Sequence, residues 1–162
     1  MSYKIDKFFH INLTDDPSTQ YISTTYTELT GSKCEIKSIN PSPDLVYKYT
    51  FHAWPDKSAS PAIYNFHLNI KLQKSNDNFS SNIVDVTGHN FSISGDTYVT
   101  SDRYMKTIHC FFIVEDFDSS HLRVVARSFS TTTKAQLHRN NSFDGSTNLD
   151  LKTHPNLIVA EV

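Results

Sequence analysis

The sequence predicts an all-β protein that folds as one domain over residues 1–162. Three observations lead to this prediction. Apolar and polar residues alternate with a period of two along several segments, which places one face of each segment against a core. Aromatic residues, which favour strands, are frequent, with 11 Phe, 8 Tyr and 1 Trp. The intervening segments are rich in Pro, Asn, Asp and Ser, which preset or stabilise turns.

Two segments show the alternation most clearly. In residues 45–54 the odd positions from 47 are Tyr, Tyr, Phe and Ala, whereas the even positions from 48 are Lys, Thr, His and Trp. In residues 62–72 the even positions from 64 are Tyr, Phe, Leu, Ile and Leu, and the positions between them are polar. Each segment is therefore predicted to be a strand with one apolar face.

The C-terminal part of the chain predicts a hairpin and a short helix. Residues 104–115 and 121–128 are strand-like and are separated by a short polar turn, which is typical of a β-hairpin. Ser130–Thr133 offers a helix cap, and Lys134–Arg139 would form a helix that ends near Asn140. Further strands are expected at residues 33–39, 82–86, 90–94, 97–100 and 156–162.

These elements amount to about eight to nine strands with one short helix before the last strand. A closed antiparallel barrel accommodates that many strands without exposed edges, so a single β-barrel is the predicted architecture. A jelly roll or another β-sandwich is the alternative.

The C-terminal third resembles the end of a lipocalin, a family of the calycin superfamily. The strands at residues 104–114 and 122–127, the helix near 133–139 and the strand at 156–162 follow the lipocalin order, and Arg127 occupies the place of the family's arginine. In the family, that arginine packs over a tryptophan of the first strand. The first-strand G-x-W motif is missing here, since the single tryptophan is Trp54. The resemblance implies a barrel with an internal ligand cavity.

The strand aromatics predict a binding function rather than catalysis. Tyrosine combines a flat apolar ring with one polar group, which suits the lining of a small-molecule cavity, although a solid aromatic core is the alternative. We therefore expect a carrier that is not an enzyme, has no cofactor and holds a small, largely hydrophobic ligand. The residues expected to bind it are Tyr47, Tyr49, Phe51, Tyr64, Phe66, Leu68, Tyr98, Tyr104 and Phe112.

No catalytic or metal-binding signature is present in the sequence. His109 and Cys110 are adjacent on a predicted strand and so point to opposite faces. Residues 131–134 only faintly resemble S-x-x-K, and the carboxylates at 115, 116 and 118 belong to a predicted turn. Three histidines, His52, His67 and His109, would hold a metal if their strands brought them together, but exposed or hydrogen-bonded imidazoles are the preferred interpretation.

Charge and cysteine content exclude further classes. The formal net charge is −2 and the charges are mixed, so neither nucleic acid nor a membrane is an expected partner. Cys34 and Cys110 have no CxxC spacing; we expect them to be buried free thiols, with one disulfide as the alternative. The first residues lack the apolar run of a signal peptide, which predicts a cytoplasmic protein unless this is a mature secreted form.

Two other functions compete with the carrier hypothesis. A β-sandwich recognition module would bind carbohydrate or protein through the loops at residues 40–44 and 54–61, and an exposed Trp54 would favour sugar stacking. A barrel enzyme, such as a cyclase or isomerase, would use the cavity together with one histidine or carboxylate.

Overall fold

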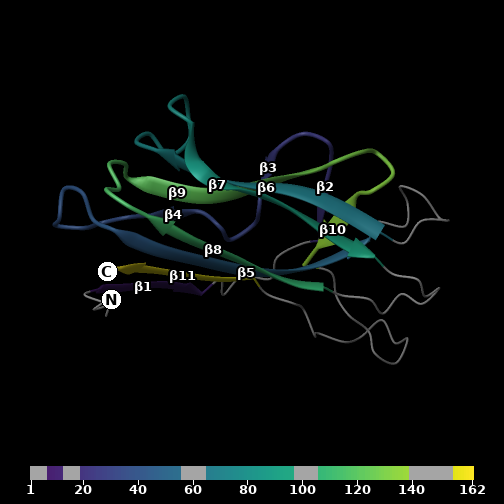
Figure 1. The fold of residues 1–162 in the computed structure, drawn as a ribbon. Coiled ribbons are helices and arrows are strands. Elements are labelled where there is room, and N and C mark those ends of the chain that lie inside the picture. The colour runs from purple at the N-terminus through teal and green to yellow at the C-terminus, as the bar shows by residue number, and fades with distance from the viewer. Residues whose placement is uncertain (1–6, 13–18, 56–64, 97–105, 139–154) are drawn as a thin grey trace.

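The protein is a β-sandwich of two antiparallel sheets (Figure 1). A computed structural model describes residues 7–12, 19–55, 65–96, 106–138 and 155–162, with the backbone alone described for the first of these ranges. These ranges contain eleven strands and no helix. The prediction of an all-β fold is therefore confirmed.

Sheet A is built around one long central strand, β5. The strand β8 pairs along one edge of β5, while β11 and β10 follow one another along the other edge, flanked by β1 and β2 respectively. Because β5 alternates buried and more exposed residues along most of its length, one face of sheet A lies against the core. The strands of sheet A are β1 (Lys7–Asn12), β2 (Gln20–Ile22), β5 (Leu45–Pro55), β8 (Lys106–Val114), β10 (Ala135–Leu137) and β11 (Asn156–Glu161).

Sheet B has the order β9, β6, β7, with β3 and β4 both pairing with β9. A register shift between Lys71 and Gln73 and a positive φ of 75° at Gly88 mark a bulge in the β6–β7 pair, so two predicted strands form one long bent strand. The strands of sheet B are β3 (Thr27–Glu28), β4 (Cys34–Glu35), β6 (Asn65–Ser75), β7 (Val84–Asp96) and β9 (His121–Ser128).

The predicted closed barrel, and with it the lipocalin resemblance, is wrong. The strand pairings of the described residues form two separate sheets, and none of them joins sheet A to sheet B. Among the described residues β7 pairs with β6 and β8 pairs with β5, and no strand pairing joins β7 to β8. The architecture is consistent with the β-sandwich alternative.

The predicted hairpin of residues 104–128 is also wrong. Its first strand, β8, belongs to sheet A and pairs with β5, whereas its second strand, β9, belongs to sheet B and pairs with β6. The turn between them crosses from one sheet to the other. Both strands bury their apolar faces in this way, because the two sheets face the same core.

The predicted helix after Ser130 is a strand instead. Residues 135–137 form β10, which pairs with β5 on one side and β2 on the other. Ala135 and Leu137 are both buried, with Gln136 between them less buried. This period of two fits a strand, since residues two apart lie on different faces of a helix. Tertiary pairing therefore overrides a weak helical propensity.

The lipocalin-like arginine occupies a different setting from the one expected. Arg127 lies on β9 with its guanidinium carbon 5.0 Å from the centre of the Tyr26 ring. Trp54, at the end of β5 in the other sheet, is only 2% exposed. An arginine does pack over an aromatic ring, but the ring comes from the segment before β3 and not from a tryptophan.

Both cysteines are free and buried in the core. Cys34 starts β4 and Cys110 lies in the middle of β8. Burial raises the pKa of each thiol to about 12, because a thiolate would be poorly solvated there. Two unreactive thiols are the result, as the sequence predicted.

Candidate functional site

The expected ligand-binding residues that the structure describes lie between the two sheets. Each of them is at most 5% exposed and belongs to the hydrophobic core. They are Tyr47, Tyr49 and Phe51 on β5, Phe66 and Leu68 on β6, and Phe112 on β8. Tyr64, Tyr98 and Tyr104 lie outside the described residues. The barrel cavity that these residues were expected to line does not exist, and their role in ligand binding stays a prediction.

The hydroxyl groups of the two buried tyrosines are bound by the protein's own backbone. Tyr47 donates a hydrogen bond to the carbonyl of Ser32, and Tyr49 donates one to the carbonyl of Thr30 at 2.6 Å. Burial raises the pKa of both phenols well above the usual value, so both stay neutral donors. These tyrosines therefore fasten the segment between β3 and β4 to sheet A.

The three candidate metal-binding histidines do not come together. His52 and His109 lie on the outer face of sheet A, hydrogen-bonded at 3.0 Å to Thr107 and Thr50 respectively. His67 lies on β6 in the other sheet. Partial burial and the neighbouring His109 lower the pKa of His52. Among the described residues no group of three or more His, Cys, Asp or Glu is placed to hold a metal ion.

The other sequence candidates for chemistry lie in separate places. His109 is exposed while Cys110 is buried, as expected for neighbours on a strand. Asp118 forms an ion pair with Lys74 at 2.5 Å, which lowers the pKa of that carboxyl. The backbone N–H of Asp116 donates a hydrogen bond to the side chain of Asp44 at 2.9 Å. These carboxylates hold turns together rather than forming a catalytic pair.

A groove lined mainly by apolar side chains opens between β7 and β8. We call it the β7–β8 groove; it has a volume of about 430 Å³ and is lined by Gly88, Asn90, Phe91, Phe111, Phe112 and Ile113. Phe91 and Phe112 form its deeper part, with ring centres 6.0 Å apart. Phe111 and Ile113 are 58% and 41% exposed. Sequence reasoning missed this groove because it placed the phenylalanines in a closed barrel.

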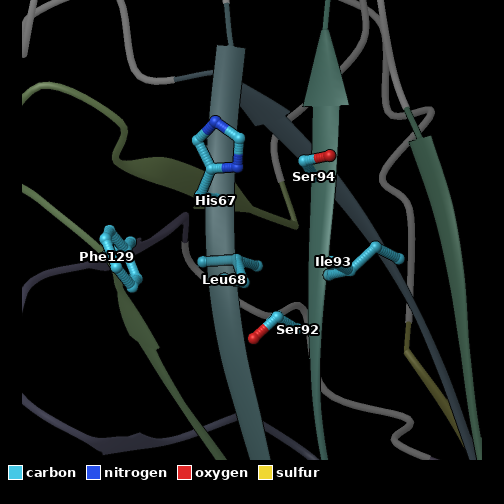
Figure 2. A pocket seen from close by; sticks show the side chains of 6 residues that line it. All are labelled: His67, Leu68, Ser92, Ile93, Ser94 and Phe129. Carbon is cyan, nitrogen blue, oxygen red and sulfur yellow. The ribbon is translucent and has the colours of Figure 1, made fainter.

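A second pocket lies on the outer face of sheet B (Figure 2). We call it the Phe129 pocket; its volume is about 390 Å³, and it is lined by His67, Leu68, Ser92, Ile93, Ser94 and Phe129. Figure 2 shows its residues on β6, on β7 and just beyond β9. Phe129 is held beside β6 by a backbone hydrogen bond from its N–H to the carbonyl of His67, at 3.0 Å. Its ring nevertheless remains exposed, since the residue is 76% accessible.

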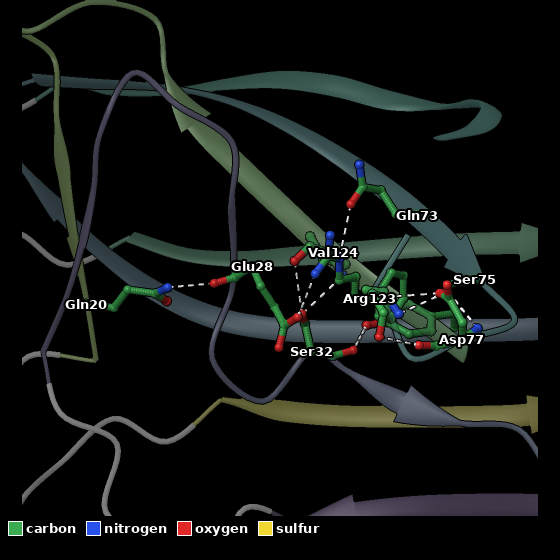
Figure 3. A network of polar contacts seen from close by, with 11 residues as sticks. Gln20, Glu28, Ser32, Gln73, Ser75, Asp77, Arg123 and Val124 are labelled. Carbon is green, nitrogen blue, oxygen red and sulfur yellow. Dashed lines mark hydrogen bonds and ion pairs between the residues drawn. The ribbon is translucent and has the colours of Figure 1, made fainter. Parts of the chain in front are cut away.

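A polar network ties sheet B together (Figure 3). Arg123 on β9 donates to Glu28 on β3 and to Gln73 on β6, both at 3.0 Å. Its guanidinium also lies 4.1 Å from the centre of the Phe79 ring in the β6–β7 turn. This arginine joins three strands and a turn, and thereby fixes the polar face of the sheet.

Asp77 organises the β6–β7 turn. Its carboxylate accepts six hydrogen bonds from the hydroxyls of Ser75 and Ser81, the N–H groups of residues 80–82 and the Asn82 amide. These bonds, those from Ser81 and Ser75 foremost, hold the pKa of Asp77 well below its ordinary value of 3.8. The turn is therefore built around an ionised carboxylate.

Acidification should loosen this turn. Because the pKa of Asp77 is lower in the folded chain than in the unfolded chain, its contacts stabilise fully above pH 3.8 and are lost as the pH falls through the folded value. We expect exchange of the amides of residues 80–82, corrected for intrinsic rates, to accelerate as the pH falls below 3.8. NMR hydrogen exchange measures this. Asp77→Asn should remove the pH dependence at these amides, and equal profiles for both proteins would contradict the prediction.

The loops proposed for recognition differ in accessibility. In the segment before β5, Ile39 is 97% exposed, next to the turn at residues 40–42. The N–H of Phe117 donates to the carbonyl of Pro43 at 2.9 Å, which fixes this segment against the β8–β9 turn. The second proposed loop begins at Trp54, which is buried, and residues 56–61 lie outside the described ranges. A sugar-stacking role for Trp54 is therefore not supported.

Comparison with solved structures gives remote matches. No known protein family and no curated protein matches the sequence. Among solved structures, one titled "Structure of infectious bursal disease virus Gx strain" aligns with a TM-score of 0.43 and 11% identity. The alignment covers 97% of this chain and 36% of the viral chain, so this chain spans about a third of that protein's length. The match is not to a lipocalin, and it is too distant to inform function.

No membrane-spanning helix is found either: in the part of the chain that the structure describes, no helix is long and apolar enough to cross a bilayer.

Proposed function

We propose that this protein is a β-sandwich recognition module that binds another polypeptide in the β7–β8 groove. The observation that carries the proposal is the exposure of Phe111 directly beside a groove with an apolar floor. A large aromatic side chain that is 58% exposed next to a pocket is the usual composition of a binding hot spot. No catalytic role is assigned to the groove.

The edges of the groove favour a polypeptide over a small ligand. In the described pairings, β7 and β8 each have one edge without a partner strand. An extended segment adds to the edge of a sheet through backbone hydrogen bonds. Alternate side chains of that strand would then enter the groove toward Phe91 and Phe112.

The interior supports this preference. The hydroxyls of Tyr47 and Tyr49 donate hydrogen bonds to backbone carbonyls. They therefore offer no free polar group to a ligand between the sheets. Trp54 is buried and offers no ring to a sugar. Accessible apolar surface lies on the outside of the sandwich, where another protein can contact it.

Substitution of Phe111 with arginine should weaken the binding of extended peptides. The test uses a displayed library of peptides about twelve residues long, selected on the folded protein, and measures the Kd of the selected sequences. We expect selected peptides to alternate apolar and polar residues, and Phe111→Arg to weaken them at least about tenfold, since removal of a hot-spot side chain costs more than about 1 kcal/mol. Because Phe111 is exposed, the variant should fold normally.

A loop variant serves as the matched control. Ile39→Arg changes an even more accessible apolar residue, 97% exposed, that does not line the groove, and it should leave the Kd unchanged. If Ile39→Arg abolishes binding and Phe111→Arg does not, the loops are the recognition surface and the groove assignment is wrong. Failure to select any peptide would also contradict the proposal.

A further inference from the structure

The outer face of sheet B has a regular polar pattern. Strand register places Arg127, Asn69 and Ser92 side by side on β9, β6 and β7. The adjacent row contains His67 and Ser94, with Phe129 next to His67. All of these positions share one face, because residues two apart on a strand point to the same side. The Phe129 pocket therefore lies directly next to the row that contains Arg127.

The positively charged side chains of this face differ in whether a carboxylate forms an ion pair with them. Lys71 forms an ion pair with Asp85 at 2.6 Å, and Arg123 forms one with Glu28 at 3.0 Å. Arg127 has no carboxylate and no hydrogen-bond acceptor among the described residues, and its Nε is buried without a partner. Its recorded contact is with the ring of Tyr26. Arg127 is thus a half-buried cation that no carboxylate among the described residues neutralises.

The geometry of Arg127 suits a carboxylate. A guanidinium presents paired N–H donors that match the two oxygens of a carboxylate. Stacking on Tyr26 restrains its orientation, so little side-chain entropy remains to be lost on binding. The ammonium of Lys71, which is paired with Asp85, lies 4.6 Å from the centre of the same ring.

The Phe129 pocket, next to the row that contains Arg127, supplies an aromatic surface and small polar groups. The ring of Phe129 is 76% exposed and offers a flat surface. Ser92, Ser94 and His67 add two hydroxyls and an imidazole around it. An aromatic surface bordered by small polar groups fits the apolar face and the hydroxyls of a sugar ring. A volume of about 390 Å³ is at the small end of ligand sites, which suits one or two sugar units.

We propose that the outer face of sheet B binds an acidic saccharide, with a sugar ring on Phe129, its hydroxyls on Ser92, Ser94 and His67, and its carboxylate on Arg127. This site is distinct from the β7–β8 groove, since it uses the face of sheet B rather than the edge of β8. It also explains why Arg127 is left uncompensated on a face whose other arginine and lysine are paired.

Titration with matched sugars tests the proposal. Amide shifts in NMR spectra would be followed with glucuronate, with glucose and with acetate, which separate the ring from the charge. We expect glucuronate to bind at least about tenfold more tightly than either, because a charge-assisted bond adds to ring stacking. Shifts should concentrate on residues 67–69, 92–94 and 127–129. Equal binding of acetate and glucuronate would mean a simple anion site and would overturn the proposal.

Two variants distinguish the contribution of Arg127 from that of Phe129. Arg127→Gln should reduce glucuronate binding to the level of glucose, whereas Phe129→Ala should weaken both sugars by a similar factor and keep the preference for the acid. Lys48→Gln, which removes an exposed cation from the other sheet, is the control and should change neither. Because Phe129 is exposed, its variant tests the proposal even if Arg127→Gln unfolds. An unchanged preference in Arg127→Gln, or unchanged binding in Phe129→Ala, would refute it.

Discussion

Replacing Phe51 with alanine should lower the free energy of unfolding by about 3–5 kcal/mol. The Phe51 side chain is completely buried, and its ring stacks on Tyr49 with 5.5 Å between the ring centres. It lies opposite Ile108 of β8, so its removal leaves a cavity between sheet A and the core that neighbouring strands cannot fill without breaking register. Urea unfolding at equilibrium measures the loss.

The neighbouring strand provides the matched control. Phe111→Ala removes the same atoms from β8, but this side chain is 58% exposed, so we expect a loss of about 1 kcal/mol or less. The same variant should weaken peptide binding at the β7–β8 groove. Equal losses of stability in the two variants would show that the two strands do not face the core as described.

Replacing Ser32 with alanine should destabilise the fold by about 1–3 kcal/mol, although only one oxygen atom is removed. The Ser32 side chain is fully buried, and its hydroxyl donates to the carbonyl of Val124 at 3.0 Å and accepts from the N–H of Val124 at 3.1 Å. The hydroxyl thus bonds to the backbone of β9 at a position between the residues that pair with β3 and those that pair with β4. Loss of the hydroxyl leaves the N–H of Val124 unsatisfied, whereas the Val124 carbonyl still accepts from the N–H of Leu29 at 2.9 Å. One unsatisfied buried backbone group costs about 1–3 kcal/mol.

Ser42→Ala is the matched control for this prediction. Ser42 lies in the exposed turn before β5, where its backbone N–H, not its side chain, makes the recorded hydrogen bond to Asn40. We expect a change within about 0.5 kcal/mol. If thermal unfolding shows similar stability for both serine variants, water replaces the hydroxyl at Ser32 and the proposed role of that side chain is wrong.

The strands with strict alternation could be predicted from the sequence because their pattern is local. β5 and β6 bury every second residue over most of their length, and that periodicity is readable without knowledge of their partners. β10 could not be predicted in the same way. Its three residues carry too little pattern to outweigh a plausible helix cap before them, and only pairing with β2 and β5 makes them a strand.

Sheet membership could not be predicted because it depends on partners far along the chain. β8 and β9 are adjacent in sequence, both apolar, and joined by a short turn, which locally is indistinguishable from a hairpin. Their separation into two sheets follows from pairing with β5 and β6. The choice between a barrel and a sandwich has the same origin, since closure depends on whether the last strand edges meet.

The two candidate binding surfaces could not be predicted from the sequence for a related reason. The tyrosines of β5 were expected to line a cavity, but a buried tyrosine looks the same in sequence whether its hydroxyl meets a ligand or a carbonyl such as that of Thr30. Conversely, Phe111 and Phe129 look like core residues until the strand edge or the end of β9 leaves them exposed. The resemblance that drew attention to Arg127 was wrong, yet that residue is central to the saccharide proposal.

The order in which strands pair has a consequence for how the chain folds. Of the nine strand pairings described, only β6–β7 joins strands that follow one another in sequence. The chain must therefore close long loops before most of its contacts form, which makes folding slow compared with proteins of local topology. Because β1 pairs with β11, β1 cannot form its native pairing during synthesis until β11 has been made. The β6–β7 hairpin, whose strands follow one another in sequence, is where we expect structure to form first.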